Sequence, residues 1–282
     1  MLQLDKGPVL TQEVFRLLRD LINQYSGLYF DDSYREIFQH RLQRRLSVHK
    51  LGSFMDYYRF LLYDPRRHQE METLMDILTV NETYFFREVS QFEVLVKEII
   101  PEILDNTRPG KTLRMLSAGC STGEEPYTMA IFCFEYGILQ RTNLEIIGID
   151  ISKRVLSRAR SGIYTENSFR ATDKRYLEKY FIPLDNHQFR IDEKLKKVVT
   201  FYHGNLLDSV RLGLFSPVDI VFCRNVLIYF DMRSRKRVIN NLYRVLRPGG
   251  YLFLGHSESL LSIPNDFEFL YKGRELVYRK PQ

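Results

Sequence analysis

One short stretch, residues 113–127, constrains the fold of this chain more than any other. It reads LRMLSAGCSTGEEPY: an apolar strand, a turn containing Gly119 and Gly123, and the start of a helix. Such a glycine turn lets a ligand approach the backbone closely, and the helix N-terminus adds a partial positive charge. The next apolar strand, residues 144–149, ends in Asp150, whose carboxylate can accept hydrogen bonds from a ribose diol. Together these features predict a site for a nucleoside-type cofactor.

The spacing around the turn excludes two familiar phosphate-binding sites. Gly119 and Gly123 do not fit G-x-G-x-x-G, and no Lys follows Gly123 as in a P-loop. Glu124 and Glu125 stand where a pyrophosphate would rest, and they would repel it. They suit a cationic cofactor with a ribose and no phosphate, which favours S-adenosylmethionine. The alternative is an ordinary strand-to-helix turn whose glycines only relieve backbone strain.

Composition is that of a globular protein of one large or two modest domains, with 282 residues, of which 44% are hydrophobic and 27% charged. No run of about 18 apolar residues is present, so we expect no membrane insertion, and the first residues lack a signal-peptide pattern. Cys120, Cys133 and Cys223 show no metal-ligand spacing. We therefore expect a cytoplasmic protein without a bound metal.

The net charge of +6 raises the question of a nucleic-acid partner. The excess is divided between residues 153–200 and a helix predicted from Arg35 to Lys50. A charge this modest and divided does not require a polyanion, and we expect no nucleic acid. Each basic patch is either a solvated face or a surface for an acidic partner.

The chain divides near residue 100 into a helical part, residues 1–100, and an α/β part, residues 101–282. Predicted helices open at Thr11, Asp31–Ser33 and Ser53, and two more cover residues 70–78 and 91–104, before a closing turn at residues 107–110. In the second of these helices Tyr34, Ile37, Phe38, Leu42 and Leu46 form an apolar ridge. Arg41, Arg44 and Arg45 fall away from it, which predicts an exposed basic face.

After residue 112, strands and helices alternate, which predicts a parallel sheet with crossover helices. We expect strands at 112–117, 144–149, 198–202, 218–223 and 251–254, helices at 124–136, 152–160 and 233–246, a turn at 246–250, and a closing antiparallel hairpin at 267–270 and 276–278. Ligands of such sheets bind at the carboxyl ends of the strands. Asn205 is then placed to read an adenine edge beside Leu206, and Arg224, Asn225 and Tyr229 converge on a second substrate. The alternative for Asn225 is a helix cap.

Four segments resemble the chemotaxis receptor methyltransferases, the CheR family. Residues 79–87 (TVNETYFFR) resemble its N-E-T-x-F-F-R signature. So do residues 121–127 (STGEEPY), 222–230 (FCRNVLIYF), and 246–250 (LRPGG) with 255–258 (GHSE). The four motifs stand in order, and the resemblance covers roughly residues 10–280.

The resemblance implies methylation of glutamate side chains on transmembrane chemoreceptors, with S-adenosylmethionine as cofactor and S-adenosylhomocysteine as product. It implies a Rossmann-like class I methyltransferase domain, an N-terminal all-helical domain, and a small β-subdomain inserted at about residues 163–197. It places Asn81, Thr83 and Arg87 over the cofactor. It assigns to Glu124 the binding of the cofactor's amino group. The full set of expected cofactor contacts is Asn81, Thr83, Arg87, Ala118, Gly119, Glu124, Asp150, Asn205, Leu206, Asn225 and Val226.

The chemistry of such a reaction suits these residues. A glutamate carboxylate is ionised at pH 7 and needs no general base to attack the sulfonium methyl group. A guanidinium can hold that carboxylate bidentately, and Arg87 is the residue that we assign to this role. Tyr229 is assigned a hydrogen bond or the angle of attack. Phe85 and Phe86 are expected in the core.

Expectations about partners follow from the same resemblance. Arg41, Arg44 and Arg45 would face the acidic methylation helices of a receptor. Some family members bind a receptor's C-terminal tether peptide through a glycine-rich hairpin turn. The equivalent stretch here, residues 180–190, contains no glycine and is shorter than that hairpin, so we expect no tether binding. We also expect a monomer.

Two alternative functions remain. One is a non-catalytic receptor-binding adaptor. The other is a methyltransferase of nucleic acids or small molecules, although residues 223–226 do not match the N-P-P-Y-like motif of amino-group methylation.

Overall fold

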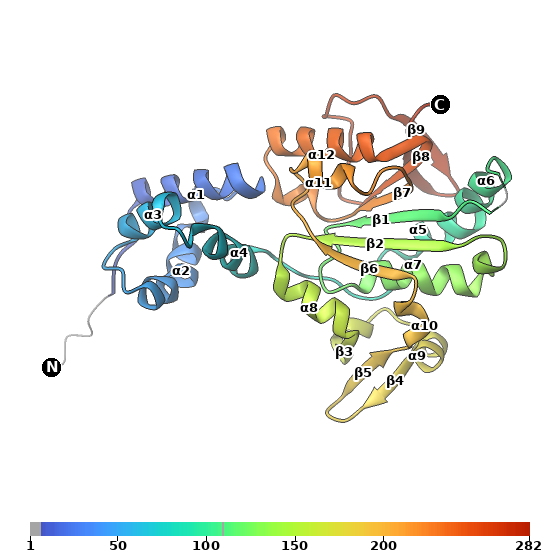
Figure 1. The fold of residues 1–282 in the computed structure, drawn as a ribbon, viewed down its shortest axis with the longest axis horizontal. Helices are drawn as coiled ribbons and strands as arrows, with labels where there is room; N and C mark the ends of the chain where they lie inside the picture. The colour runs from blue at the N-terminus through green and yellow to red at the C-terminus, as the bar shows by residue number, and fades with distance from the viewer. Residues whose placement is uncertain (1–6, 109) are drawn as a thin grey trace. The chain divides into compact units, whose positions relative to one another are not determined.

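The computed structural model describes residues 7–108 and 110–282, which form two compact units (Figure 1). The first unit holds the chain up to Val80 together with Tyr229–Ser234, and the second holds Asn81–Ile228 and Arg235–Gln282. The division falls before the expected boundary near residue 100. The reason is that the apolar side chains of residues 92–100 are buried in the core of the second unit. Pro109, part of the predicted closing turn, lies outside the described residues.

The first unit is built from helices whose starts are set by side-chain caps. They are α1 (Gln12–Ser26), the 3-10 turn η1 (Asp32–Tyr34), α2 (Arg35–His49), α3 (Phe54–Tyr63) and α4 (Arg67–Leu78). Thr11 and Ser53 accept hydrogen bonds from backbone N–H groups in the first turns of α1 and α3, and Asp31 does so for η1. The predicted helix starts are confirmed at these three positions.

Apolar side chains at helical spacing form the core of the first unit. Phe38, Leu42 and Leu46 of α2 are buried as predicted, and the Phe38 ring meets Phe15 of α1 edge to face. Tyr34 and Ile37, which the predicted ridge included, are exposed instead. The buried stripe of α2 is therefore narrower than the sequence indicated.

The second unit is built on a seven-stranded sheet, in which β6, β2, β1, β7 and β8 succeed one another (Figure 1). Its order is β6-β2-β1-β7-β8-β10-β9. The strands are β1 (Leu113–Ala118), β2 (Leu144–Asp150), β6 (Val199–His203), β7 (Val218–Cys223), β8 (Leu246–Leu254), β9 (Glu268–Lys272) and β10 (Glu275–Arg279). The five neighbouring strands β6, β2, β1, β7 and β8 pair in parallel. The hairpin of β9 and β10 closes the sheet with antiparallel pairing, as predicted. The strand order reverses between β1 and β7, which places a ligand crevice at their carboxyl ends.

Helices and short turns precede and connect these strands. They are α5 (Val89–Val94), a π-helical segment (Leu95–Ile99), α6 (Ile100–Asp105), α7 (Glu124–Glu135), η3 (Ile138–Gln140), α8 (Lys153–Ser161), α11 (Ser209–Gly213), η5 (Leu227–Tyr229) and α12 (Met232–Val245). In the described chain, none of the helices has both the length and the apolar character to cross a membrane.

Two predicted elements differ in detail. The helix expected at 91–104 is interrupted by the π-helical segment. No periodicity in the sequence predicted this interruption. The turn expected at 246–250 is instead a bulge inside β8, where the pairing with β7 shifts between Val218 and Ile220. Gly250 permits this close contact, because a Cβ there would lie 2.9 Å from the Asp219 carbonyl oxygen.

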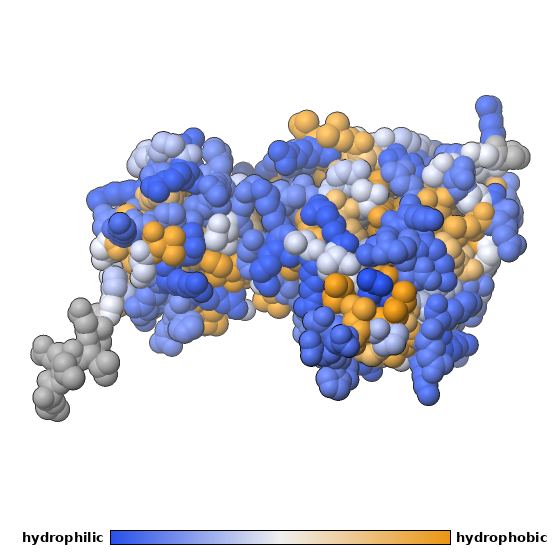
Figure 2. All heavy atoms as spheres, turned by 60° about the horizontal axis from the view of Figure 1, so that its bottom comes forward, coloured by the Kyte–Doolittle hydropathy of each residue, from blue (hydrophilic) through white to orange (hydrophobic). Residues whose placement is uncertain are grey.

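A small β-subdomain lies between α8 and β6, where the family resemblance implied it. It contains β3 (Ile163–Thr165), η4 (Glu166–Phe169), α9 (Lys174–Tyr180), β4 (Phe181–Leu184), β5 (Gln188–Ile191) and α10 (Glu193–Lys196). The strands pair antiparallel in the order β3-β5-β4, so β4 is an edge strand. Figure 2 brings this side of the second unit forward and shows apolar side chains among polar ones there. Ile182 of β4 is 47% exposed.

Candidate active site

The turn after β1 adopts a conformation that requires its glycines. Gly119 and Gly123 have φ of 82° and 92°, in the left-handed region that favours glycine. A Cβ on Gly119 would lie 2.5 Å from Val226 Cγ2, so the turn after β1 packs directly against the loop after β7. The N–H groups of Gly119 and Cys120 donate to the Ile149 carbonyl at 2.8 and 3.0 Å, which fixes the turn to β2. Two strand ends predicted to share one site are thus in contact.

Asp150 stands at the end of β2, beside the same turn. Its Oδ2 accepts from the Ser121 N–H at 2.9 Å, and its Oδ1 accepts from the Ser152 N–H at 2.9 Å. The side chain is 8% exposed. These two hydrogen bonds hold the carboxylate beside the turn after β1. The ribose contact predicted for Asp150 stays a prediction.

Residues after β6 line the same edge of the sheet. Asn205 Oδ1 accepts from the Leu207 N–H at 2.9 Å, which shapes the turn. Leu206 is buried, and its carbonyl accepts from Asn241 Nδ2 at 2.9 Å. Asn205 and Leu206 therefore lie at the carboxyl end of β6, next to that of β2. The adenine contacts predicted for them stay predictions.

The segment 81–87 runs along the turn after β1. Ser121 Oγ donates to the Asn81 carbonyl at 3.4 Å, and Thr83 is partly buried. Phe85 is buried in a cluster of aromatic rings from the β-subdomain, and its N–H donates to the Ser168 carbonyl at 2.9 Å. Phe86 is also buried, so the core role predicted for both rings is confirmed. The two rings anchor the segment on which Asn81, Thr83 and Arg87 are carried.

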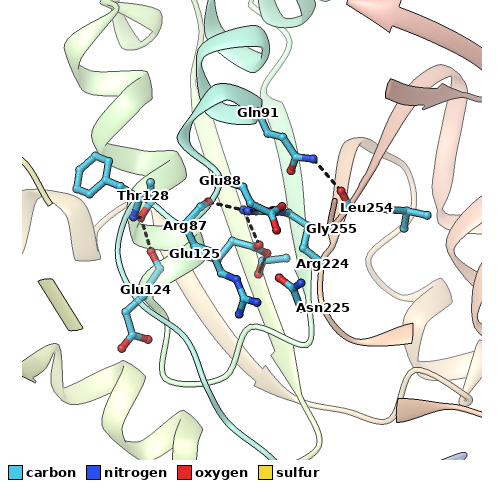
Figure 3. A network of polar contacts seen from close by, with 12 residues as sticks. Arg87, Glu88, Gln91, Glu124, Glu125, Thr128, Arg224, Asn225, Leu254 and Gly255 are labelled. Atoms are coloured by element: carbon cyan, nitrogen blue, oxygen red, sulfur yellow. Dashed lines mark hydrogen bonds and ion pairs between the residues drawn. The ribbon is translucent and has the colours of Figure 1, made fainter. Parts of the chain in front are cut away.

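Arg224 does not line an open substrate space as the sequence suggested, but joins three of the motifs from within the protein (Figure 3). Its side chain is 2% exposed. Nη2 donates to the Arg87 carbonyl at 2.6 Å and pairs with Glu88 Oε2 at 3.0 Å, while Nη1 pairs with Glu125 Oε2 at 3.2 Å. A charged group this buried is kept by its partners, so Arg224 has a structural role.

Arg87 contrasts with Arg224. Its side chain is partly exposed and extends away from the Arg224 network in Figure 3. Nη1 donates to the Glu82 carbonyl at 3.3 Å, and the guanidinium lies 5.6 Å from the centre of the Tyr84 ring. Among the described residues no carboxylate pairs with it. Arg87 is therefore a guanidinium with capacity to bind a carboxylate.

Glu124 and Glu125 are adjacent in sequence but serve different surroundings. Glu125 accepts from Ser117 Oγ at 2.7 Å and pairs with Arg224; burial raises its pKa, which the charge of Arg224 opposes. Glu124 is 1% exposed and accepts from the hydroxyl groups of Thr122 and Ser168 at 2.6 and 3.1 Å; burial raises its pKa as well. Its predicted contact with the cofactor's amino group stays a prediction.

Asn225 and Val226 lie on the loop after β7, where Asn225 has a left-handed φ of 57°. Sequence reasoning missed what holds this loop: the carboxylate of Glu258 accepts hydrogen bonds from its backbone. The signal was present in the GHSE motif, although nothing in the motif itself shows which atoms the glutamate contacts. Ala118, buried at the end of β1, completes the predicted positions in this unit.

The remaining predicted residues belong to the first unit. Of the three arginines of α2 that were predicted to form an exposed basic face, only Arg44 is exposed. Arg41 Nη1 donates to the Ile77 and Leu78 carbonyls at 3.1 and 3.2 Å, and Arg45 pairs with the buried Glu70 at 2.6 Å. The predicted exposed basic face is therefore wrong for Arg41 and Arg45, because both side chains are used to hold α4.

Tyr229 belongs to the same compact unit as α1. It is partly buried, and its carbonyl accepts from the Tyr29 N–H at 2.9 Å. Its role toward a reacting carboxylate stays a prediction. Within residues 7–108 and 110–282, no three His, Cys, Asp or Glu side chains are grouped so as to hold a metal ion.

Comparison with known proteins assigns both units to one family. Residues 13–79 match the model of the CheR methyltransferase all-alpha domain, and residues 81–275 match that of the CheR methyltransferase SAM binding domain. The boundary between these matches coincides with the division of the structure at Val80 and Asn81.

Relatives of similar length support the same family assignment. The chain is 36% identical to chemotaxis protein methyltransferase 2 of Vibrio cholerae over 97% of this chain and 94% of that protein. It is 36% identical to the chemotaxis protein methyltransferase of Borreliella burgdorferi over 88% of each chain, and 32% identical to Cher2 of Pseudomonas putida over 94% and 97%. The glycine turn, Asp150 and the 81–87 segment thus belong to a domain that binds S-adenosylmethionine, and the chain is a member of the CheR methyltransferase family.

Proposed function

We propose that this protein transfers the methyl group of S-adenosylmethionine to glutamate side chains of chemoreceptors and forms glutamyl methyl esters. Its relatives are named chemotaxis protein methyltransferases, which supports the receptor as substrate. The observation that carries the choice of a carboxylate is Arg87, a guanidinium without a carboxylate partner among the described residues. It follows in the same segment as Asn81, whose carbonyl accepts from Ser121 of the turn after β1. A guanidinium recognises a carboxylate bidentately.

The chain's own residues then supply binding and orientation. Asp150, Asn205 and Leu206 are assigned to the nucleoside part of the cofactor, and the turn at Ala118 and Gly119 to its close approach. Asn81, Thr83, Glu124, Asn225 and Val226 complete the assignment. The bound cofactor supplies the electrophilic methyl group. Arg87 holds the attacking carboxylate in line, with Tyr229 orienting it, and positioning of this kind supplies most of the acceleration. No general base is needed, since the carboxylate is ionised.

The experiment that tests this function uses methyl-labelled S-adenosylmethionine and membranes containing chemoreceptors. The labelled receptor is digested, and mass spectrometry locates the methyl group on individual residues. Methyl groups on glutamate side chains are expected, and receptors with those glutamates replaced by alanine should take up no label. Methyl groups on lysine or arginine nitrogens would contradict the proposal.

Receptor recognition is proposed to involve α2 through Arg44. Arg44 is exposed and makes no ion pair among the described residues, whereas Arg41 and Arg45 are engaged inside the unit. Arg44→Glu is therefore the clean charge reversal. It should raise the receptor KM and leave the cofactor Kd unchanged. A receptor KM equal to that of the wild type would remove α2 from the proposal.

Tether-peptide binding is not expected of the β-subdomain. A peptide that adds to a sheet must hydrogen-bond to an edge strand. Of the two edge strands of this sheet, β3 has only 3 residues, and β4 carries Pro183, which lacks an N–H group. The hairpin between β4 and β5 also turns without glycine, through left-handed Asn186 and His187. Calorimetry with a receptor C-terminal peptide should detect no micromolar binding. We further propose a cytoplasmic monomer, which sedimentation of the purified protein tests.

A further inference from the structure

We propose that Glu258 is a positioning residue of the methyltransferase site: its carboxylate holds the 225–228 loop in the conformation that presents Asn225 and Val226. The inference rests on the proposed cofactor site, since those two residues are assigned to it. Glu258 itself is not assigned a contact with cofactor or substrate.

The contacts of Glu258 are unusual for a single side chain. Oε2 accepts from the N–H groups of Asn225 and Gly255 at 2.7 and 2.9 Å. Oε1 accepts from the N–H groups of Val226 and Leu227 at 2.9 and 2.7 Å, and from that of Ile228 at 3.4 Å. One carboxylate therefore serves consecutive N–H donors of the loop.

These donors have a clear need for an acceptor. They open the short η5 turn, and the first N–H groups of a helical turn have no partner within it. An N-cap side chain usually satisfies such groups locally. Here Asn225 is turned into a left-handed φ of 57°, and the acceptor comes from a residue 30 or more positions later in the chain. Glu258 acts as a helix cap supplied from another loop.

The sheet explains why the two loops meet. β7 and β8 are parallel neighbours, with Cys223 opposite Leu254, so both chains leave the same edge of the sheet side by side. Gly255 follows at once, and a Cβ there would lie 2.9 Å from Asn225 Nδ2 and 3.0 Å from the Asn225 backbone nitrogen. The short Gly255–Glu258 turn is closed by the Glu258 N–H, which donates to the Gly255 carbonyl at 2.9 Å.

The position of the loop matters for the site because Val226 packs against Gly119. A methyl group on Gly119 would already collide with Val226 Cγ2. A shift of the loop therefore changes the space directly over the glycine turn. Displacements of about 1 Å in such positioning elements can cost about 100-fold in rate.

The test compares Glu258→Gln with a matched control, Glu102→Gln, in the full chain. Glutamine keeps the size of glutamate but replaces one acceptor oxygen by an NH₂ group that faces N–H donors. Glu102 is a carboxylate of the same unit that accepts from Tyr251 Oη and Lys272 Nζ, both at 2.7 Å, and touches none of the assigned site residues. Both variants lose hydrogen bonds of a partly buried carboxylate.

Two readouts separate positioning from general stability. Hydrogen exchange of peptides covering residues 224–230, without cofactor, should be faster by about tenfold in Glu258→Gln, since a hydrogen bond lost at about 1.4 kcal/mol opens the amide tenfold more often. Peptides of β7 should be unchanged. The Kd for S-adenosylhomocysteine by calorimetry should rise by about tenfold or more in Glu258→Gln and stay within twofold of wild type in Glu102→Gln.

The outcomes are distinguishable from failure of the proposed site. Wild-type exchange and wild-type Kd in Glu258→Gln would overturn the inference, as would an equal loss of affinity in both variants. If Glu258→Gln does not fold, Glu258→Asp, which keeps the charge on a shorter arm, is measured in the same way, and an unchanged loop and Kd again contradict the inference. A wild-type protein that does not bind S-adenosylhomocysteine would refute the cofactor site, whereas the exchange measurement needs no ligand.

Discussion

At the scale of single residues, partners decide the role of a side chain more than its type does. Arg87 and Arg224 both stand in motifs at the same edge of the sheet. Arg224 is 2% exposed and joins Glu88, Glu125 and the Arg87 carbonyl, while the partly exposed Arg87 guanidinium donates to the Glu82 carbonyl and has no carboxylate partner among the described residues. Sequence reasoning placed both arginines at the site but could not separate them, because burial and partners are not visible in a motif.

This contrast gives the first prediction. Arg224→Ala leaves Glu88 and Glu125 without their cation, and breaking a buried pair in this way should lower the free energy of unfolding by about 3–5 kcal/mol. Arg87→Ala should change it by less than about 0.5 kcal/mol, as other surface substitutions do, and should reduce kcat/KM for the receptor by about 100-fold. Urea unfolding and methylation kinetics measure the two quantities. The reverse pattern would mean that the roles are exchanged.

The glycine turn gives the second prediction. Gly119→Ala places a methyl group 2.5 Å from Val226 Cγ2 at a φ of 82°, so we expect a destabilisation of about 1–3 kcal/mol and loss of measurable S-adenosylhomocysteine binding. Gly52→Ala is the matched control, because nothing lies within 4 Å of its Cβ. The double variant Gly119→Ala with Val226→Ala should recover part of the stability. Calorimetry showing wild-type affinity in Gly119→Ala would contradict the packing described here.

At the scale of elements, the start of a helix was easier to predict than its interior. The caps Thr11, Asp31 and Ser53 fix helix starts through local hydrogen bonds, which the sequence displays directly. The π-helical segment at Leu95–Ile99 and the bulge in β8 depend on packing against the rest of the second unit, and no local pattern encodes them. The prediction of an exposed basic face on α2 was wrong for Arg45 for the same reason, because Arg45 forms an ion pair with Glu70 on another helix.

The third prediction concerns that pair of helices. Glu70 is 3% exposed and binds Arg45, His49 and Tyr57; burial raises its pKa, but the hydrogen bonds from these partners outweigh burial, and the pKa is lowered from 4.5. A carboxyl whose folded pKa lies below its unfolded value adds stability above the unfolded pKa. That stability is lost as the pH falls through the folded value.

Glu70→Gln should therefore lower the free energy of unfolding by about 3–5 kcal/mol at pH 7, where it leaves Arg45 unpaired. The difference from wild type should shrink as the pH falls below about 4.5. Urea unfolding of both proteins at pH 7 and at lower pH values measures it. A difference that grows on acidification would show that Glu70 is not held as a carboxylate.

At the scale of the whole molecule, the type of sheet was the most predictable feature. Alternating strands and helices indicated a parallel sheet, and the residues after β1, β2, β6 and β7 indicated one ligand edge. The contacts between loops were not predictable. Glu258 shows why: its partners lie some thirty residues earlier in sequence and become neighbours only when β7 and β8 pair.

Cofactor binding should also stabilise the second unit as a whole. A ligand that binds only the folded state adds about 2.7 kcal/mol at a concentration of 100 times its Kd. S-adenosylhomocysteine should thus raise the thermal unfolding midpoint of the wild type, and it should do so far less in Asp150→Ala. An equal rise in both proteins would place the ligand elsewhere.

The most direct test of the site is a crystal structure of this protein with S-adenosylhomocysteine. We predict the ribose hydroxyls on the Asp150 carboxylate, the adenine beside Asn205 and Leu206, and the homocysteine end toward Arg87 and the Gly119 turn. Such a complex would join the glycine turn, the four strand ends and the 81–87 segment in one site. A ligand bound away from the carboxyl ends of β1, β2, β6 and β7 would contradict the account.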